Sequence, residues 1–171
     1  MEADMIEAPS RFDLASRQGR ERAKADLIWA DHGFLRTNFS NFHWIEPGIM
    51  ARANQPSPTQ LAGYAGLGIK TILNLRGPSD TGYYLLEREA CQRHGLALVD
   101  ARMFSREPPS REKVLEVKQI FETIQYPALM HCKSGADRAG VMAVLYKHLK
   151  MGLPIAEAIE QLSLKYLHVN T

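Results

Sequence analysis

The stretch from residue 131 to residue 138, which reads HCKSGADR, constrains this chain more than any other part of it. A short apolar run at 127–130 precedes it and has the composition of a buried strand. The residues that follow, 139–150, carry apolar side chains at helical spacing. Cys132 is therefore predicted to lie in the turn between a strand and a helix.

A cysteine in such a turn has a specific chemistry. Backbone N–H groups and the positive end of the helix dipole face its sulfur and favour the thiolate. The same amides form a cradle for a phosphate dianion, and Arg138 can pair two phosphate oxygens at once. Gly135 allows a positive φ and is expected to keep a side chain out of the path of the anion. This combination indicates cleavage of a phosphate monoester through a cysteinyl-phosphate.

The stretch resembles the Cys-x5-Arg signature of the protein tyrosine phosphatases, in particular their atypical dual-specificity-like branch. His131 directly precedes the cysteine, Gly135 follows it by three residues, and the motif lies in the last third of the chain. Segments 54–58 (NQPSP) and 69–77 (IKTILNLRG) also resemble small atypical members. The resemblance covers about residues 43–165. It implies an α/β fold of the dual-specificity type, with a central sheet flanked by helices.

The remaining segments agree with that architecture, because strand-like runs alternate with runs of helical spacing and so favour a sheet covered by helices on both faces. Strands are expected at 42–45, 49–52, 69–75, 96–99 and 127–130, and helices at 58–65, 83–93, 110–124, 139–150 and 154–162. Residues 1–40 are interpreted as an N-terminal extension and residues 41–171 as the phosphatase domain. The extension is expected to hold a helix at 15–33, which either covers the domain surface or docks a partner.

Length and composition limit the other possibilities. A chain of 171 residues suits one domain with a substantial core. The net charge of +2 gives no reason to expect nucleic acid or an anionic membrane as a partner. We find no apolar run long enough to span a bilayer and no signal peptide, so a cytoplasmic protein is expected. Two cysteines do not make a disulfide framework, and a thiolate nucleophile needs a reducing compartment.

The resemblance implies a role for each position of the loop. Cys132 is the expected nucleophile and Arg138 the expected phosphate clamp, while His131 orients the loop through hydrogen bonds. No metal or other cofactor is expected. The Lys133 side chain either meets an acidic group of the substrate or is solvated. The phosphate is expected to be bound, mainly through backbone amides together with the clamp, by Lys133, Ser134, Gly135, Ala136, Asp137 and Arg138.

The residue that donates a proton to the leaving group, the general acid, is not found at the position where the family carries it. The leaving oxygen needs a proton, which family members take from an aspartate on a loop upstream of the signature, like 102–109 here. The aligned position holds Ser105, which is a poor acid. Asp137, inside the signature loop, is the favoured substitute, although it could instead accept hydrogen bonds from loop amides. Glu107 on the upstream loop and Asp100 at the end of a strand are the alternatives.

Two further features bear on activity. Many relatives carry a hydroxyl residue where this chain has Ala139, and that hydroxyl helps the thiolate to leave, so its absence disfavours fast turnover. Cys91 is interpreted as a core residue, with a reversible disulfide to Cys132 as the alternative.

The expected substrate is a phosphorylated protein, through phosphotyrosine or dual specificity. An inositol phosphate, a phosphoinositide or a phosphate-binding pseudophosphatase is the alternative, and a rhodanese-type sulfurtransferase fits the loop less well.

Overall fold

A five-stranded sheet forms the centre of this protein, for which a computed structural model describes residues 11–36, 38–104 and 107–169. The strand order is β1-β2-β5-β3-β4; β1 runs antiparallel to β2, and all other neighbours are parallel. The carboxyl ends of the four parallel strands therefore meet at one edge, where ligands bind in open sheets of this kind. The strands are β1 (His43–Glu46), β2 (Met50–Ala53), β3 (Thr71–Asn74), β4 (Ala97–Asp100) and β5 (Ala128–His131).

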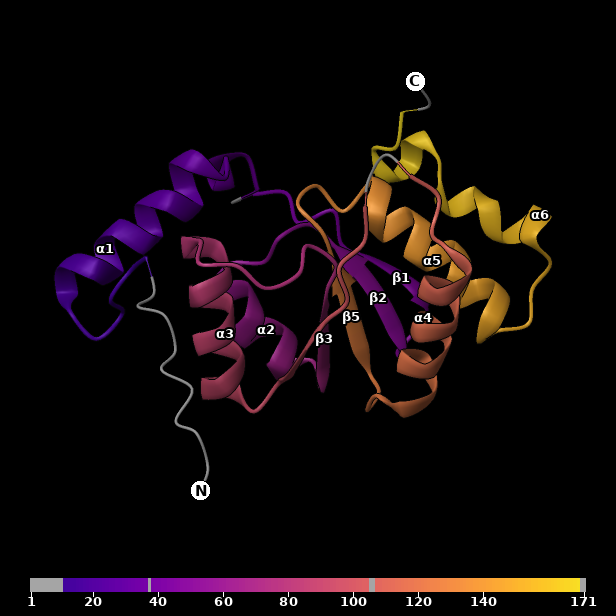
Figure 1. Ribbon diagram of the computed structural model, residues 1–171, viewed down its shortest axis with the longest axis horizontal. Helices are drawn as coiled ribbons and strands as arrows, with labels where there is room; N and C mark the ends of the chain where they lie inside the picture. Colours follow the sequence, from indigo (N-terminus) through magenta and orange to yellow (C-terminus); the bar gives the residue numbers. More distant parts are fainter. Residues whose placement is uncertain (1–10, 37, 105–106, 170–171) are drawn as a thin grey trace.

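Helices cover both faces of the sheet, as predicted (Figure 1). On one face α2 and α3 pack over an apolar cluster that includes Leu61, Ile72 and Leu129. On the other face α4 and α5 pack over a second apolar cluster, which includes Phe121 and Tyr146. The helices of these layers are α2 (Pro58–Gly66), α3 (Gly82–His94), α4 (Arg111–Thr123) and α5 (Asp137–Leu149).

Local signals explain why these helices begin and end where they do. Ser57 accepts a hydrogen bond from the backbone N–H of Gln60 at 3.2 Å, and the Gln60 side chain accepts one from Ser57 in return. Ser110 caps α4 in the same way through its hydroxyl. α3 ends at Gly95, whose φ of 66° is a left-handed conformation that suits glycine.

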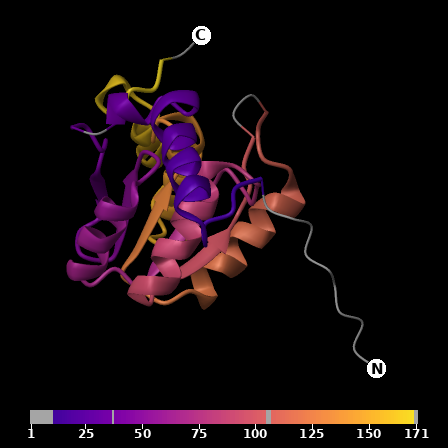
Figure 2. The ribbon, with the colours of Figure 1, turned by 90° about the vertical axis from the view of Figure 1, so that its left-hand side faces the viewer.

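The N-terminal segment, which we define as residues 17–36, is less regular than expected. A single helix was predicted over 15–33, whereas α1 (Arg17–Ala25) passes into a π-helical turn at Asp26–Ala30 and a 3-10 turn at Gly33–Arg36. The segment packs on α3, on the side that faces away from the sheet (Figures 1 and 2). Ala23 and Leu27 are buried against α3, so the segment covers part of the domain surface, while Ile28 stays exposed.

The C-terminal segment, residues 155–169, also differs from the prediction. Instead of one helix over 154–162, α6 (Ile155–Ala158) is followed by a 3-10 turn at Ile159–Gln161 and another at Leu164–Tyr166. Ile155 and Ile159 are exposed, while Gln161 and Tyr166 are buried. Ala158 is also buried, so the segment is held by this residue and by the contacts of Gln161 and Tyr166 with Arg52. In the described part of the chain, no helix is long and apolar enough to cross a membrane.

Candidate active site

The predicted loop connects β5 to α5 at the carboxyl edge of the sheet, with β2 and β3 on either side of β5. Cys132 directly follows the strand and is only 1% exposed. The backbone N–H of Gly135 donates a hydrogen bond to its sulfur, with N and Sγ 3.2 Å apart. An N–H that points at the sulfur stabilises a thiolate there more than it stabilises a thiol.

Gly135 is required for a reason that differs in part from the expected one. Its φ of 75° confirms that the loop needs a left-handed residue at this position. A Cβ atom there would lie 2.8 Å from the backbone carbonyl of Ala53 and 2.8 Å from the backbone nitrogen of Asn54. The side-chain position thus faces the end of β2, not the path of an anion, and the glycine lets the loop pack tightly on that strand.

A cavity of about 520 Å³ opens above the loop and reaches the buried cysteine. Gly135 and Ala136 are buried and do not line the cavity with side chains, so they can contribute only through their backbone. The cavity brings together most of the predicted site residues with side chains from both termini. Its lining consists of Cys132, Lys133, Ser134, Asp137 and Arg138 from the loop region, and of His32, Leu35, Arg36, Phe39, Asn54 and Leu167.

The three candidate acids lie in different surroundings. Asp137 lines the cavity with a half-exposed side chain, and its Oδ1 is 2.8 Å from Nδ1 of His168 in the C-terminal segment. Glu107 lines a separate cavity of about 190 Å³. Asp100 accepts hydrogen bonds from the Asn74 amide at 2.8 Å and from the Tyr84 hydroxyl at 2.7 Å, so both of its oxygens are engaged. Ser105 lies outside the described residues.

Arg52 is a site residue that sequence reasoning missed. It lies in β2, is fully buried, and donates hydrogen bonds to the carbonyls of Gly135 at 2.8 Å and Ala136 at 3.0 Å. On its other side it donates to Gln161 at 2.8 Å, and its guanidinium lies 4.3 Å from the ring centre of Tyr166. Arg52 therefore ties the loop to the C-terminal segment. The signal was an arginine inside an otherwise apolar strand, where a charge needs partners.

Arg52 keeps its positive charge although it is buried. Burial lowers the pKa of Arg52 to about 10, while negative charge at Cys132 and Tyr166 raises it. The guanidinium therefore stays protonated at neutral pH, directly beneath the loop.

Replacing Arg52 with methionine is expected to lower the free energy of unfolding by about 3 kcal/mol, because buried carbonyls lose charged hydrogen-bond donors. Urea denaturation of purified protein measures this change. Arg111→Met, at an exposed position at the start of α4, serves as the control and is expected to change stability by less than about 0.5 kcal/mol. Equal stabilities of the two variants would contradict the proposed support of the loop.

A chain of polar contacts links the loop to the N-terminal segment. His131 and the buried Glu87 of α3 share a short hydrogen bond through Nε2 and Oε1. Glu87 accepts a second hydrogen bond from the Gln55 amide at 3.1 Å, and Gln55 accepts one from Arg76 at 2.9 Å. Arg76 then forms two hydrogen bonds with Asp31, at 2.7 and 2.9 Å. The predicted orienting role of His131 thus has a defined partner, Glu87.

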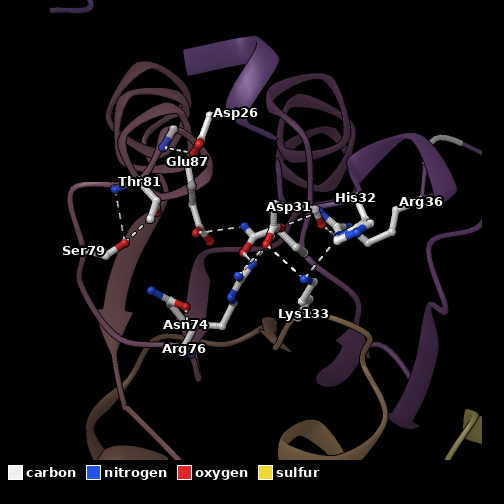
Figure 3. Close-up of polar contacts among 12 residues, drawn as sticks. Asp26, Asp31, His32, Arg36, Asn74, Arg76, Ser79, Thr81, Glu87 and Lys133 are labelled. Carbon is white, nitrogen blue, oxygen red and sulfur yellow. Dashed lines mark hydrogen bonds and ion pairs between the residues drawn. The ribbon is translucent and has the colours of Figure 1, made fainter. Parts of the chain in front are cut away.

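Asp31 is the last residue in this series of hydrogen bonds, and it lies at the centre of Figure 3. Arg36 donates to its Oδ2 at 2.6 Å, and Nζ of Lys133 is 3.7 Å from its Oδ1. Burial opposes ionisation of Asp31, but hydrogen bonding from Arg76 and the charges of Arg76, Arg36 and Lys133 hold its pKa below the ordinary value. Sequence reasoning placed Asp31 in an extension outside the domain, and no local pattern indicates that it reaches the site.

The remaining predicted residues have simple surroundings. Cys91 and Cys132 are both free, and they belong to different apolar clusters, on opposite faces of the sheet. Burial raises the pKa of Cys91 to about 12, as expected for a core thiol. Ala139 is fully buried in α5. In the described ranges, no three His, Cys, Asp or Glu side chains gather as possible metal ligands.

Comparison with known proteins agrees with this architecture. The family model PTP-SAK, described as the DSP-PTPase phosphatase domain of Swiss Army Knife proteins, matches residues 39–163. No curated protein matches the chain significantly.

Several solved structures share the fold. Tk-PTP in its active form has a TM-score of 0.63 at 23% identity, over 78% of this chain and 90% of its own. The core catalytic domain of the PP-IP phosphatase SIW14 from S. cerevisiae, in complex with citrate, has a TM-score of 0.63 at 17% identity, over 74% and 76%. A cysteine-to-serine variant of P. aeruginosa TpbA in complex with phosphotyrosine has a TM-score of 0.56 at 16% identity, over 77% and 83%.

Proposed function

Since this chain belongs to the PTP-SAK family of DSP-PTPase phosphatase domains and is therefore a Cys-dependent phosphatase, we propose that it hydrolyses phosphotyrosine in proteins. The observation that carries this proposal is the shape of the cavity. Cys132 lies at its buried end, while three exposed apolar side chains, Leu35, Phe39 and Leu167, line it. Apolar walls above an anion-binding loop suit a phosphate that is carried on an aromatic ring.

In the proposed mechanism the Cys132 thiolate attacks phosphorus, and the bond between phosphorus and the tyrosine oxygen breaks. The loop amides and the Arg138 guanidinium hold the three equatorial oxygens, whose charge they stabilise in the transition state. Water then attacks the cysteinyl-phosphate, which releases inorganic phosphate and restores the thiolate. Arg52 supports both steps, because its hydrogen bonds to the carbonyls of Gly135 and Ala136 hold the loop in place.

Asp137 supplies the proton for the leaving tyrosine oxygen in this mechanism. The pair with His168 occupies Oδ1, so Oδ2 remains available for the leaving group. A phosphate dianion bound in the loop disfavours a second negative charge beside it, and so favours the neutral carboxyl group that can donate. The same pair fixes the orientation of the carboxyl group at the start of α5.

An inositol phosphate is the second candidate substrate. It is supported by the gathering of Arg36, Arg76 and Lys133 around Asp31 at one side of the cavity, where one carboxylate offsets only one of three positive charges. A structural neighbour is a PP-IP phosphatase. The apolar side chains at the other side of the cavity would have no counterpart in such a substrate.

Phosphate release from a matched panel tests the proposal. The panel contains a phosphotyrosine peptide, the same peptide with phosphoserine, and inositol hexakisphosphate, each assayed with and without a chelator. We expect the highest kcat/KM for the phosphotyrosine peptide, with no effect of the chelator. Faster hydrolysis of the inositol phosphate would contradict the proposal, and release of less than one phosphate per protein would indicate a pseudophosphatase, as Ala139 allows.

A further inference from the structure

The N-terminal segment lies outside the residues that the family model matches, yet it forms one side of the cavity. His32, Leu35 and Arg36 line the cavity from this segment. The segment is held in place by its packing on α3 and by the two hydrogen bonds between Arg76 and Asp31. The N-terminal segment, which a phosphatase domain of this family does not include, therefore lies beside the reacting cysteine.

The positive charges on this side of the cavity differ in accessibility. Arg36 and Arg76 are almost completely buried and bind Asp31 directly. Lys133 keeps 42% of its side chain exposed and is held only loosely, with Nζ 3.7 Å from Asp31. Because the two arginines already compensate the carboxylate, the ammonium group of Lys133 is available for another anion.

His32 lies next to this lysine, with Nδ1 3.5 Å from Nζ, and both side chains line the cavity (Figure 3). The backbone of His32 has a φ of 60°, and that of Leu167, which also lines the cavity, has a φ of 64°. A non-glycine residue in this region costs free energy, and such residues cluster at ligand sites. The cavity is thus bordered by two strained positions, one from each end of the described chain.

We propose that Lys133 and His32 form a second anion subsite, which binds an acidic side chain adjacent to the phosphotyrosine of the substrate protein. This inference rests on the proposed function and adds a sequence preference to it. The apolar residues Leu35, Phe39 and Leu167 favour a peptide over a compact polyphosphate, because the tyrosine ring would cover them while the acidic neighbour meets the lysine. Lys133 donates to the acidic group as an ammonium, and His32 donates a ring N–H.

Two phosphotyrosine peptides that differ only in the residues flanking the phosphotyrosine, glutamate in one and glutamine in the other, test this subsite. We expect the wild-type protein to hydrolyse the glutamate peptide with a kcat/KM about tenfold higher, as for one charge-assisted hydrogen bond. Lys133→Gln and His32→Asn are each expected to lower this ratio to about two or three. Asparagine tolerates the positive φ at position 32, so the second variant keeps the local backbone.

Lys118→Gln on α4 removes the same charge at an exposed position that does not line the cavity, and we expect it to keep the wild-type ratio. Equal kcat/KM for the two peptides in the wild-type protein, or a ratio that neither variant lowers, would overturn the subsite. So would an inositol polyphosphate that is hydrolysed better than both peptides. If neither peptide is hydrolysed, the proposed function fails together with this inference; equal hydrolysis of both overturns the subsite alone.

Discussion

Cys132→Ser is expected to abolish hydrolysis and to retain binding of phosphate. Kcat should fall by at least about 10⁴-fold, the scale lost when a covalent nucleophile is removed, because a serine hydroxyl in this loop stays protonated at neutral pH. The loop amides and Arg138 remain in place, so the anion cradle survives. Phosphate release from the phosphotyrosine peptide measures the loss. Isothermal titration with the same peptide measures the retained binding.

Cys91→Ala is the matched control, because Cys91 is the other cysteine of the chain and is buried on the opposite face of the sheet. It is expected to lose some stability from the small cavity, and to keep kcat close to that of the wild type. Activity near the wild-type level in Cys132→Ser would show that another group forms the intermediate. A loss of both binding and activity, with an intact fold, would show that the serine disrupts the loop itself.

Asp137→Asn is expected to give the second largest effect, and one that depends on the leaving group. Loss of a general acid costs about 100- to 10,000-fold when the leaving group needs a proton. The tyrosine oxygen of a phosphotyrosine peptide needs one, whereas a nitrophenolate needs little help. The ratio of kcat/KM for the peptide to kcat/KM for para-nitrophenyl phosphate should therefore fall steeply in the variant.

Glu107→Gln and Asp100→Asn are the controls for this assignment. Glu107 lines another cavity, so its variant should keep the wild-type ratio. Asp100→Asn loses an acceptor for Asn74 and Tyr84 and should lower stability without changing the dependence on the leaving group. If Asp137→Asn slows both substrates equally, the residue has only a structural role with His168. If Glu107→Gln alone changes the ratio, the acid lies on the loop before α4.

The sequence predicted the parts of this protein whose cause is local. Apolar runs and periodic spacing located all five strands and the helices α2 to α5, and Ser57 and Ser110 marked helix starts because a hydroxyl caps an N–H three residues away. The signature loop was equally visible, since a cysteine, a glycine and an arginine at fixed spacing define one turn. The two ends were predicted less well: the expected helix at 154–162 is only the short α6 followed by 3-10 turns, and Ile155 and Ile159 are exposed.

Only the tertiary structure decided how the loop is supported and what surrounds it. Arg52 meets Gly135 across 83 positions of the chain, and Arg76 meets Asp31 across 45. Such contacts depend on which strands are neighbours and on where the N-terminal segment packs, and neither is encoded in the spacing of nearby residues. A buried arginine in the sequence indicates that partners must exist, but the folded chain alone determines that the partners of Arg52 are the carbonyls beneath the reacting cysteine.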